Sequence, residues 1–171
     1  MLTIRATTRL LKRAKIQPDP APPASTGKLG DWYGNLLIVR PAQLVLCVSE
    51  RTLLPVLGPA KDVAGLAERL MNGAGDVLRA IGVAEVEVLR ELEHMRDVRF
   101  AKTASRPILG SMNDFAFMFE MGSKLVEDSG PRPLLEEALQ LAKAPCSPIG
   151  MDSPDRATRA LFLRPTLTVV R

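Results

Sequence analysis

The chain has 171 residues, of which 46% are hydrophobic and 25% charged, and its net charge is +4. This composition excludes wholesale disorder, and the absence of any apolar run of about 18 residues excludes a membrane-spanning helix. The length predicts a single domain over residues 1–171, able to bury roughly 70% of the surface that the unfolded chain exposes. We expect a soluble, cytoplasmic protein with no membrane contact.

The cysteines and the histidine give little basis for metal chemistry. Cys47 lies in an apolar run and is expected to be a small buried hydrophobe, whereas Cys146 lies in a proline-rich loop. The chain has one histidine and lacks the CxxC, HxxxH and HExxH patterns that zinc sites use. We therefore expect neither a structural metal nor a cofactor.

The excess positive charge lies at the N-terminus, where residues 1–60 hold eight basic and three acidic side chains. Five basic residues precede the first acid: Arg5, Arg9, Lys12, Arg13 and Lys15. They could contact nucleic-acid phosphates, form a mitochondrial presequence, or be an ordinary solvated helix face. The alternation in residues 1–6 favours a strand of the fold over a targeting segment.

After that strand, Thr7 or Thr8 can cap a helix that continues to Ile16. Residues 17–28 contain four prolines and predict a loop.

The next apolar runs, residues 35–40 and 43–49, predict a β-hairpin whose continuously apolar centre is typical of strands covered on both faces. The segment from Thr52 to Leu57 is too short to assign, and Pro55 argues against a central strand. A further strand is predicted at residues 97–103.

Apolar residues at steps of three and four predict a helix at residues 60–81, and further helices are predicted at residues 84–95, 133–143 and 154–163. Ser153 as N-cap and Pro154 as the first helical residue begin the last of these. Residues 164–171 alternate like a strand but could equally fray.

Another helix is predicted to start at Ser111, with Asp114 three residues later as the carboxylate of a capping box. Its apolar residues cover most of the circumference, from Phe115 to Val126, which is typical of a central helix.

Three groups of polar residues are candidates for a site. Asp31, Trp32, Tyr33 and Asn35 could form a binding surface or anchor a loop on the core. Ser111, Asn113 and Asp114 could bind an anion or support nucleophilic chemistry at a helix start, although a capping box explains the same residues. Glu91 and His94 could bind a metal or belong to a solvated helix face.

Four strings, LGDWYGNLL, LCVSERTLLPVL, KTASRPILGSMNDFAF and APCSPIGMDSPDRATRALF, follow one another along the chain. In this order they resemble an uncharacterised family of small bacterial proteins with LGDWY-NLL, NERTLL-like and LGSMNDF motifs, some of them plasmid-associated. The resemblance implies no activity. Arg51, which lies in the second string, is also a candidate binding residue.

We expect an α+β fold with a small, largely antiparallel sheet, covered on one face by the helices of residues 60–127. The LGDWYGNLL and GSMNDF strings should pack together, with Trp32 close to Asp114.

Two functions are open. The first is a non-enzymatic binding or regulatory protein for a protein partner or a nucleic acid, and the scarcity of histidine favours it. The second is a small enzyme with a site built from the LGDWYGN and SMND segments. Convergence of Asp31, Asn113 and Asp114 in one pocket would favour the enzyme, whereas their separation would favour the binding protein.

Overall fold

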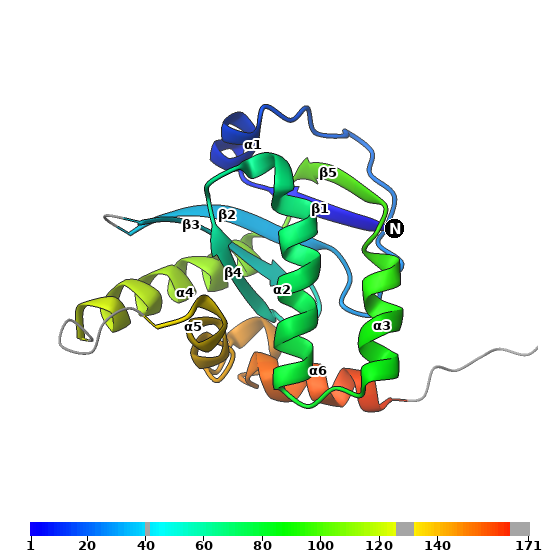
Figure 1. The fold of residues 1–171 in the computed structure, drawn as a ribbon, viewed down its shortest axis with the longest axis vertical. Helices are drawn as coiled ribbons and strands as arrows, with labels where there is room; N and C mark the ends of the chain where they lie inside the picture. The colour runs from blue at the N-terminus through cyan, green and yellow to red at the C-terminus, as the bar shows by residue number, and fades with distance from the viewer. Residues whose placement is uncertain (40–41, 126–131, 165–171) are drawn as a thin grey trace, which may run out of the picture.

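The computed structural model describes residues 1–39, 42–125 and 132–164 (Figure 1). Its strands and helices, in chain order, are β1 (Leu2–Ala6), α1 (Thr8–Ala14), β2 (Trp32–Val39), β3 (Ala42–Ser49), β4 (Pro55–Pro59), the 3-10 turn η1 (Val63–Gly65), α2 (Leu66–Ala80), α3 (Glu85–His94), β5 (Val98–Lys102), α4 (Arg106–Leu125), α5 (Leu134–Leu141), the 3-10 turn η2 (Ser147–Ile149) and α6 (Pro154–Leu163). No helix in these ranges combines the length and the apolar character needed to cross a bilayer.

The five strands form one mixed sheet in the order β4-β3-β2-β1-β5. The predicted hairpin is confirmed as β2 and β3, which pair antiparallel, and β4 extends it antiparallel. The central strand β1 is parallel to both β2 and β5. The α+β class is therefore confirmed, but the prediction of a largely antiparallel sheet is wrong. The long connections through α1 and through α2 and α3 return the chain in the same direction.

The segment that the sequence left unassigned, Thr52 to Leu57, contains the first three residues of β4. Pro55 and Pro59 bound this strand, and β4 lies at the edge of the sheet. Proline lacks the N–H that a second neighbouring strand would need, so an edge is where such a strand is tolerated. Pro55 therefore excludes a central strand at this position but is compatible with an edge strand.

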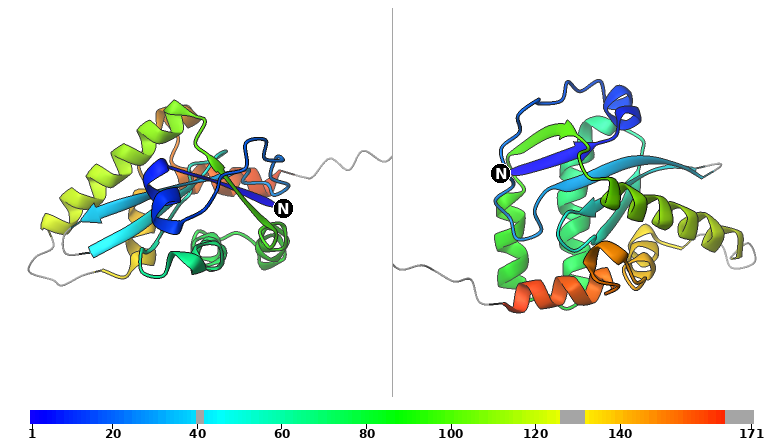
Figure 2. Two further views of the ribbon diagram at one scale, coloured as in Figure 1. Left: turned by 90° about the horizontal axis from the view of Figure 1, so that it is seen from above. Right: turned by 180° about the vertical axis from the view of Figure 1, so that it is seen from behind.

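Helices cover both faces of the sheet, which corrects the prediction of a one-sided cover. Figure 2 shows α2 and α3 on one face and α4 on the other. We call these the α2 face and the α4 face. The central apolar run of β3, residues 44–49, is buried throughout, as predicted for a strand covered on both sides.

Helix α4 begins earlier than the sequence indicated. Ser105 precedes it, and the Ser105 hydroxyl accepts a hydrogen bond from the Ile108 amide at 3.4 Å. Residues 106–110, which precede the predicted start at Ser111, therefore form the first part of the helix, and Pro107 lies in its first turn, where its missing N–H costs nothing. Ser111 and Asp114 lie inside the helix, so the predicted capping box is wrong.

Helix α4 is also less buried than predicted. One stripe packs on the sheet, formed by Ile108, Met112, Phe115 and Phe119. The neighbouring apolar side chains are exposed, with Phe117 64%, Met118 40% and Met121 42% accessible. The helix lies across the sheet surface rather than at the centre of the molecule.

The remaining elements follow the sequence closely. Thr7 caps α1, which ends at Ala14 rather than Ile16 because Lys15 adopts a left-handed conformation with φ of 55°. Ser153 and Pro154 begin α6 as predicted. The predicted strand or frayed tail of residues 164–171 lies, apart from Arg164, outside the described residues.

Candidate functional site

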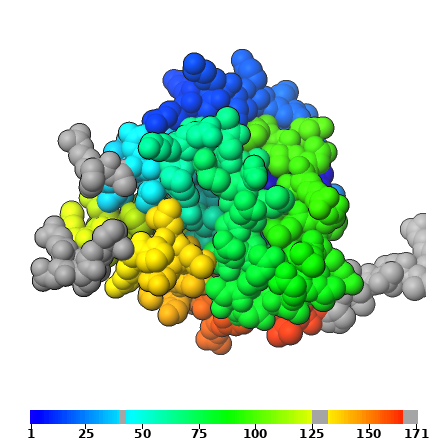
Figure 3. Space-filling model, viewed as in Figure 1, coloured from blue at the N-terminus to red at the C-terminus, as the bar shows by residue number. Residues whose placement is uncertain are grey.

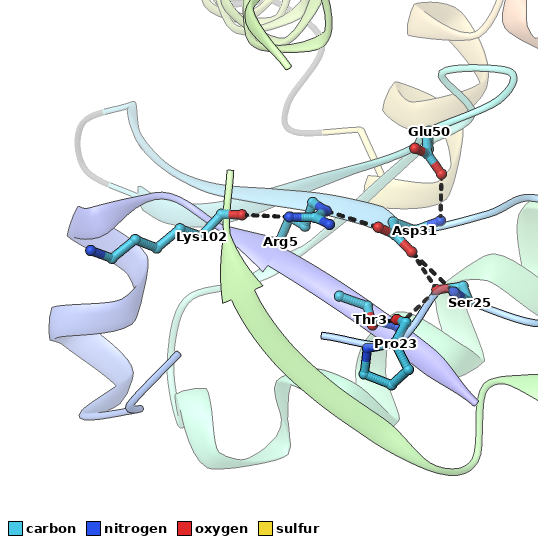
Figure 4. Close-up of polar contacts among 7 residues, drawn as sticks. All are labelled: Thr3, Arg5, Pro23, Ser25, Asp31, Glu50 and Lys102. Atoms are coloured by element: carbon cyan, nitrogen blue, oxygen red, sulfur yellow. Dashed lines mark hydrogen bonds and ion pairs between the residues drawn. The ribbon is translucent and has the colours of Figure 1, made fainter. Parts of the chain in front are cut away.

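An ion pair between Arg5 and Asp31 lies at the centre of a polar cluster on the α4 face (Figure 4). The Arg5 Nε atom donates to Asp31 Oδ2 at 2.8 Å, and the two side chains are 22% and 9% exposed. Arg5 Nη1 also donates to the backbone carbonyl of Lys102 at 3.1 Å. One guanidinium group thus joins β1 to the start of β2 and to the end of β5.

Asp31 anchors the proline-rich segment as well. Its Oδ1 accepts from the Ser25 hydroxyl at 2.7 Å, while the Ser25 hydroxyl accepts from the Thr3 amide at 2.8 Å. The Thr3 hydroxyl donates to the carbonyl of Pro23 at 2.8 Å. The Asp31 amide donates to Glu50 Oε2 at 3.0 Å. With its oxygens used in this way, Asp31 has the contacts of a loop anchor.

Tyr33 belongs to the same cluster. It is buried and lies in register with Arg5 on the neighbouring strand. Burial raises the pKa of the Tyr33 phenol, the Arg5 charge lowers it, and the charges of Glu50 and Asp31 raise it further. A phenol with a raised pKa keeps its proton at neutral pH, so Tyr33 is not an activated base.

Asn35, the next candidate along β2, is held by its neighbours. Its Oδ1 accepts from the Thr7 hydroxyl at 2.7 Å, and Thr7 is the N-cap of α1. Asn35 therefore ties the start of α1 to the sheet.

Trp32 points to the opposite side of the sheet. A Cβ built at Gly34, two residues further along β2, would contact Cys47 Sγ at 3.5 Å. Cys47 lines a small cavity together with Leu70 of α2, so Gly34 and Trp32 face α2. Trp32 is fully buried, and its indole Nε1 has no hydrogen-bond partner among the described residues.

The loop of residues 27–30 is held from three sides. The buried carboxylate of Glu91 accepts from the amides of Lys28 at 2.8 Å and Leu29 at 3.1 Å. Arg51 donates to the Lys28 carbonyl at 2.9 Å, and the Lys28 ammonium lies 5.5 Å from the ring centre of Phe162 on α6. Arg51 and Glu91 therefore position a loop.

The structure supports neither the metal site nor the solvated helix face that was considered for Glu91 and His94. Glu91 is buried, so it is not part of a solvated helix face, and the ring Nδ1 of exposed His94 lies 2.8 Å from the Thr26 hydroxyl. Within the described ranges, no group of three or more His, Cys, Asp or Glu side chains is placed to hold a metal ion.

A chain of buried hydroxyl groups, which the sequence did not reveal, joins α6 to the β3–β4 turn. The Thr158 hydroxyl donates to Thr52 Oγ1 at 2.8 Å, and Thr52 Oγ1 lies 3.0 Å from the Ser49 hydroxyl. Ser49 Oγ accepts from the Leu54 amide at 3.0 Å. The only available signal was a threonine on the apolar side of α6, between Pro154 and Phe162.

A basic surface lies on α1. The apolar side of α1, Leu10 and Leu11, packs on the core, which leaves Arg9, Lys12 and Arg13 exposed on the other side. In the space-filling view, the blue N-terminal segment forms one end of the molecule (Figure 3).

An open hollow of about 390 Å³ borders this basic surface, and three lysines line it: Lys12, Lys15 and Lys102. None of the three forms an ion pair with any residue that the structure describes. Arg5 was predicted to belong to the basic surface but pairs with Asp31 instead, so its charge is compensated. We define the basic surface as Arg9, Lys12, Arg13, Lys15 and Lys102.

A family model described as "Domain of unknown function (DUF6933)" matches residues 3–157. The chain belongs to this family. No curated protein and no solved structure matches it. The resemblance to an uncharacterised domain family is thereby confirmed. The DUF6933 match runs from β1 into α6 and includes the polar cluster and the basic surface. It also includes Ser49 and Thr52 of the buried hydroxyl chain, but it ends one residue before Thr158.

In this DUF6933 domain, the helix and the strand that carry the two predicted site segments pack together, but the predicted site residues do not converge. Helix α4 packs on β2 and β3, which agrees with the expected contact between the strings. Trp32, however, faces α2 on the other side of the sheet. Asn113 and Asp114 are exposed on α4, where the Asp114 charge contributes to raising the pKa of Cys146, after the larger effect of burial. The expected proximity of Trp32 and Asp114 is therefore wrong.

Proposed function

We propose that the protein is a non-enzymatic nucleic-acid-binding protein of the bacterial cytoplasm, with a regulatory role in the cell or in a mobile element, and that its basic surface contacts the phosphate backbone. The observation that carries the proposal is the set of five exposed cations on α1 and the end of β5, without an acidic partner among the described residues. Such unpaired cations favour a polyanion.

The contrast with α3 supports this interpretation. Arg90 and Arg96 are exposed, like the α1 cations, but each pairs with a glutamate three residues earlier, Glu87 at 2.9 Å and Glu93 at 3.1 Å. Helix α1 has no acidic residue in its first turn and two cations in its last. An anion would contact α1 without displacing an internal partner.

The enzyme alternative receives less support from the same geometry. The oxygens of Asp31 accept hydrogen bonds from Arg5 and Ser25, whereas Asn113 and Asp114 are exposed on α4. Asp31 anchors a loop, and Asn113 and Asp114 lie apart from it on the surface of α4. This separation favours a binding protein over an enzyme.

The test is the salt dependence of binding to DNA and RNA, measured by fluorescence anisotropy with single-stranded and duplex oligonucleotides. Four or five neutralised phosphates predict a slope of log affinity against log salt of about −4, with little sequence preference. Arg9→Gln combined with Arg13→Gln should weaken binding and reduce the magnitude of the slope by about 2.

The matched control is Arg90→Gln combined with Arg96→Gln, which removes the same charge from α3 and should leave affinity unchanged. Absence of binding at low salt, binding that does not depend on salt, or an equal loss in both double variants would exclude the basic surface as the interface.

A further inference from the structure

The hollow beside α1 joins residues from two distant parts of the chain. Lys12 and Lys15 come from the end of α1, and Lys102 comes from the end of β5. Figure 4 shows the Lys102 side chain extending from β5 toward α1. The Lys102 backbone carbonyl accepts the 3.1 Å hydrogen bond from Arg5, which holds the end of β5 against β1. The position of Lys102 is therefore set by the polar cluster.

Part of the lining of the hollow is apolar. Leu11, Ile16 and Pro18 line it together with Thr8, Gln17 and the three lysines. The left-handed conformation of Lys15 turns the chain after α1, so that residues 16–18 come back along the helix. The hollow thus offers three cations and an apolar surface within one space of about 390 Å³, within the range of small-ligand sites.

Three lysines around one open hollow make its potential positive, which attracts an anion. None of the described residues that line the hollow is acidic. A phosphomonoester carries nearly two negative charges and three acceptor oxygens, so it fits three lysine donors better than a carboxylate does. The apolar part of the lining suits the face of a nucleobase or the carbon atoms of a sugar, and Thr8 and Gln17 add polar groups beside it.

We propose that this hollow binds the terminal phosphate of a nucleotide, either a free mononucleotide or the end of a nucleic-acid strand. The inference deepens the proposed function, because the hollow is part of the basic surface, and it names the chemical group that this part recognises. It requires no chemical step.

The experiment is isothermal titration of the full chain with a nucleoside 5′-monophosphate, the matching nucleoside and inorganic phosphate. The monophosphate should bind, and the nucleoside should not. Inorganic phosphate should bind more weakly because it lacks the apolar contact. Lys102→Gln should weaken the monophosphate about tenfold, the effect of losing one charge-assisted hydrogen bond.

Lys124→Gln is the matched control, because Lys124 is an exposed lysine on α4 that pairs with Glu120 at 3.5 Å. It should leave monophosphate affinity unchanged. Circular dichroism of both variants must match the parent chain. Equal weakening by the two substitutions, or equal affinity for nucleoside and monophosphate, would overturn the inference.

Oligonucleotides with and without a 5′-phosphate separate the two sources and the two proposals. Tighter, Lys102-dependent binding of the phosphorylated strand identifies strand ends as the ligand, and equal binding of both strands, with the monophosphate still bound, identifies the free nucleotide. Binding of strands without any binding of the monophosphate would overturn the phosphate site in the hollow and would support nucleic-acid binding by the basic surface. Binding of the monophosphate without binding of strands would support the phosphate site and overturn nucleic-acid binding.

Discussion

Arg5 and Asp31 are 26 positions apart in the sequence, yet their side chains form a 2.8 Å ion pair that joins two parallel strands. The register pairs Arg5 with Tyr33, so Asp31, two residues before Tyr33 and on the same face, is a diagonal neighbour that the long Arg5 side chain can reach. The pair fixes the proline-rich segment through Ser25 and the end of β5 through the Lys102 carbonyl. It thereby positions one lysine of the proposed phosphate site.

Arg5→Ala should destabilise the protein by about 2–3 kcal/mol, because it leaves the nearly buried Asp31 carboxylate without its cation. Urea unfolding measures the change in free energy. The control is Arg99→Ala on β5, whose partner Asp97 lies 3.1 Å away and whose pair is half exposed on both sides. That exposed pair should contribute less than about 1 kcal/mol. Equal losses in the two variants would contradict the anchoring role of Arg5.

Ser105→Ala should lower stability by about 1 kcal/mol, because it removes the hydroxyl that caps α4. Asp114→Ala should change the free energy of unfolding by no more than about 0.5 kcal/mol, since it replaces an exposed residue inside a helix by a better helix former. Thermal or urea unfolding of both variants gives the comparison. A larger loss for Asp114→Ala than for Ser105→Ala would move the start of the helix back to Ser111.

The start of α4 shows that a local sequence pattern can predict a helix without predicting the residue at which it begins. Ser111 and Asp114 have the spacing of a capping box, but Ser105 and Pro107 form an equally good helix start six residues earlier. Gly110 lies inside the longer helix, which accepts it because a stripe of other residues packs on the sheet. Local propensity does not decide between two competing starts, and tertiary packing does.

The elements were more predictable than their arrangement. Most helices and strands follow from apolar periodicity, and the buried centre of β3 follows from its continuous apolar run. Parallel pairing of β1, and the placement of α4 on the second face, depend on contacts between residues far apart in sequence. The Arg5–Asp31 pair belongs to this second kind, since no spacing rule connects positions on parallel strands.

Glu91 is an intermediate case, in which a signal was present. It lies among the apolar positions of α3, one turn after Val88 and one turn before Met95, both buried. A carboxylate at such a position is buried only when it is hydrogen-bonded, and Glu91 accepts from two backbone amides. The sequence could have indicated a structural acid there, but not the loop that it binds.

Thr52→Val should cost about 2 kcal/mol, because it leaves the buried hydroxyls of Ser49 and Thr158 without their shared partner. Thr158→Val alone should cost about half as much, because Thr52 still bonds to Ser49. The double variant should lose less than the sum of the two, which urea unfolding in a double-mutant cycle can measure. Thr8→Val, at an exposed position on α1, is the control. Additive losses would show that the hydroxyl chain is not coupled.

Because the Cys47 thiol is buried, the free energy of unfolding should decrease as the pH rises above about 9. Burial raises the pKa of Cys47 to about 12, from an ordinary value of 9.0. A pKa raised by folding gives stability that is fully present below the unfolded value and is lost as pH rises toward the folded value. Between pH 9 and pH 11 the loss from this thiol should be roughly 2–3 kcal/mol. The free energy of unfolding, measured with urea across this range, should therefore fall more steeply for the parent chain than for Cys47→Ala. This variant lacks the thiol but keeps Tyr33, Cys146 and every lysine.

The same burial predicts that Cys47 does not react with a thiol reagent at pH 8 until the protein unfolds. Parallel pH profiles for the two proteins, or rapid labelling of Cys47 in the folded state, would show that the thiol is accessible to water.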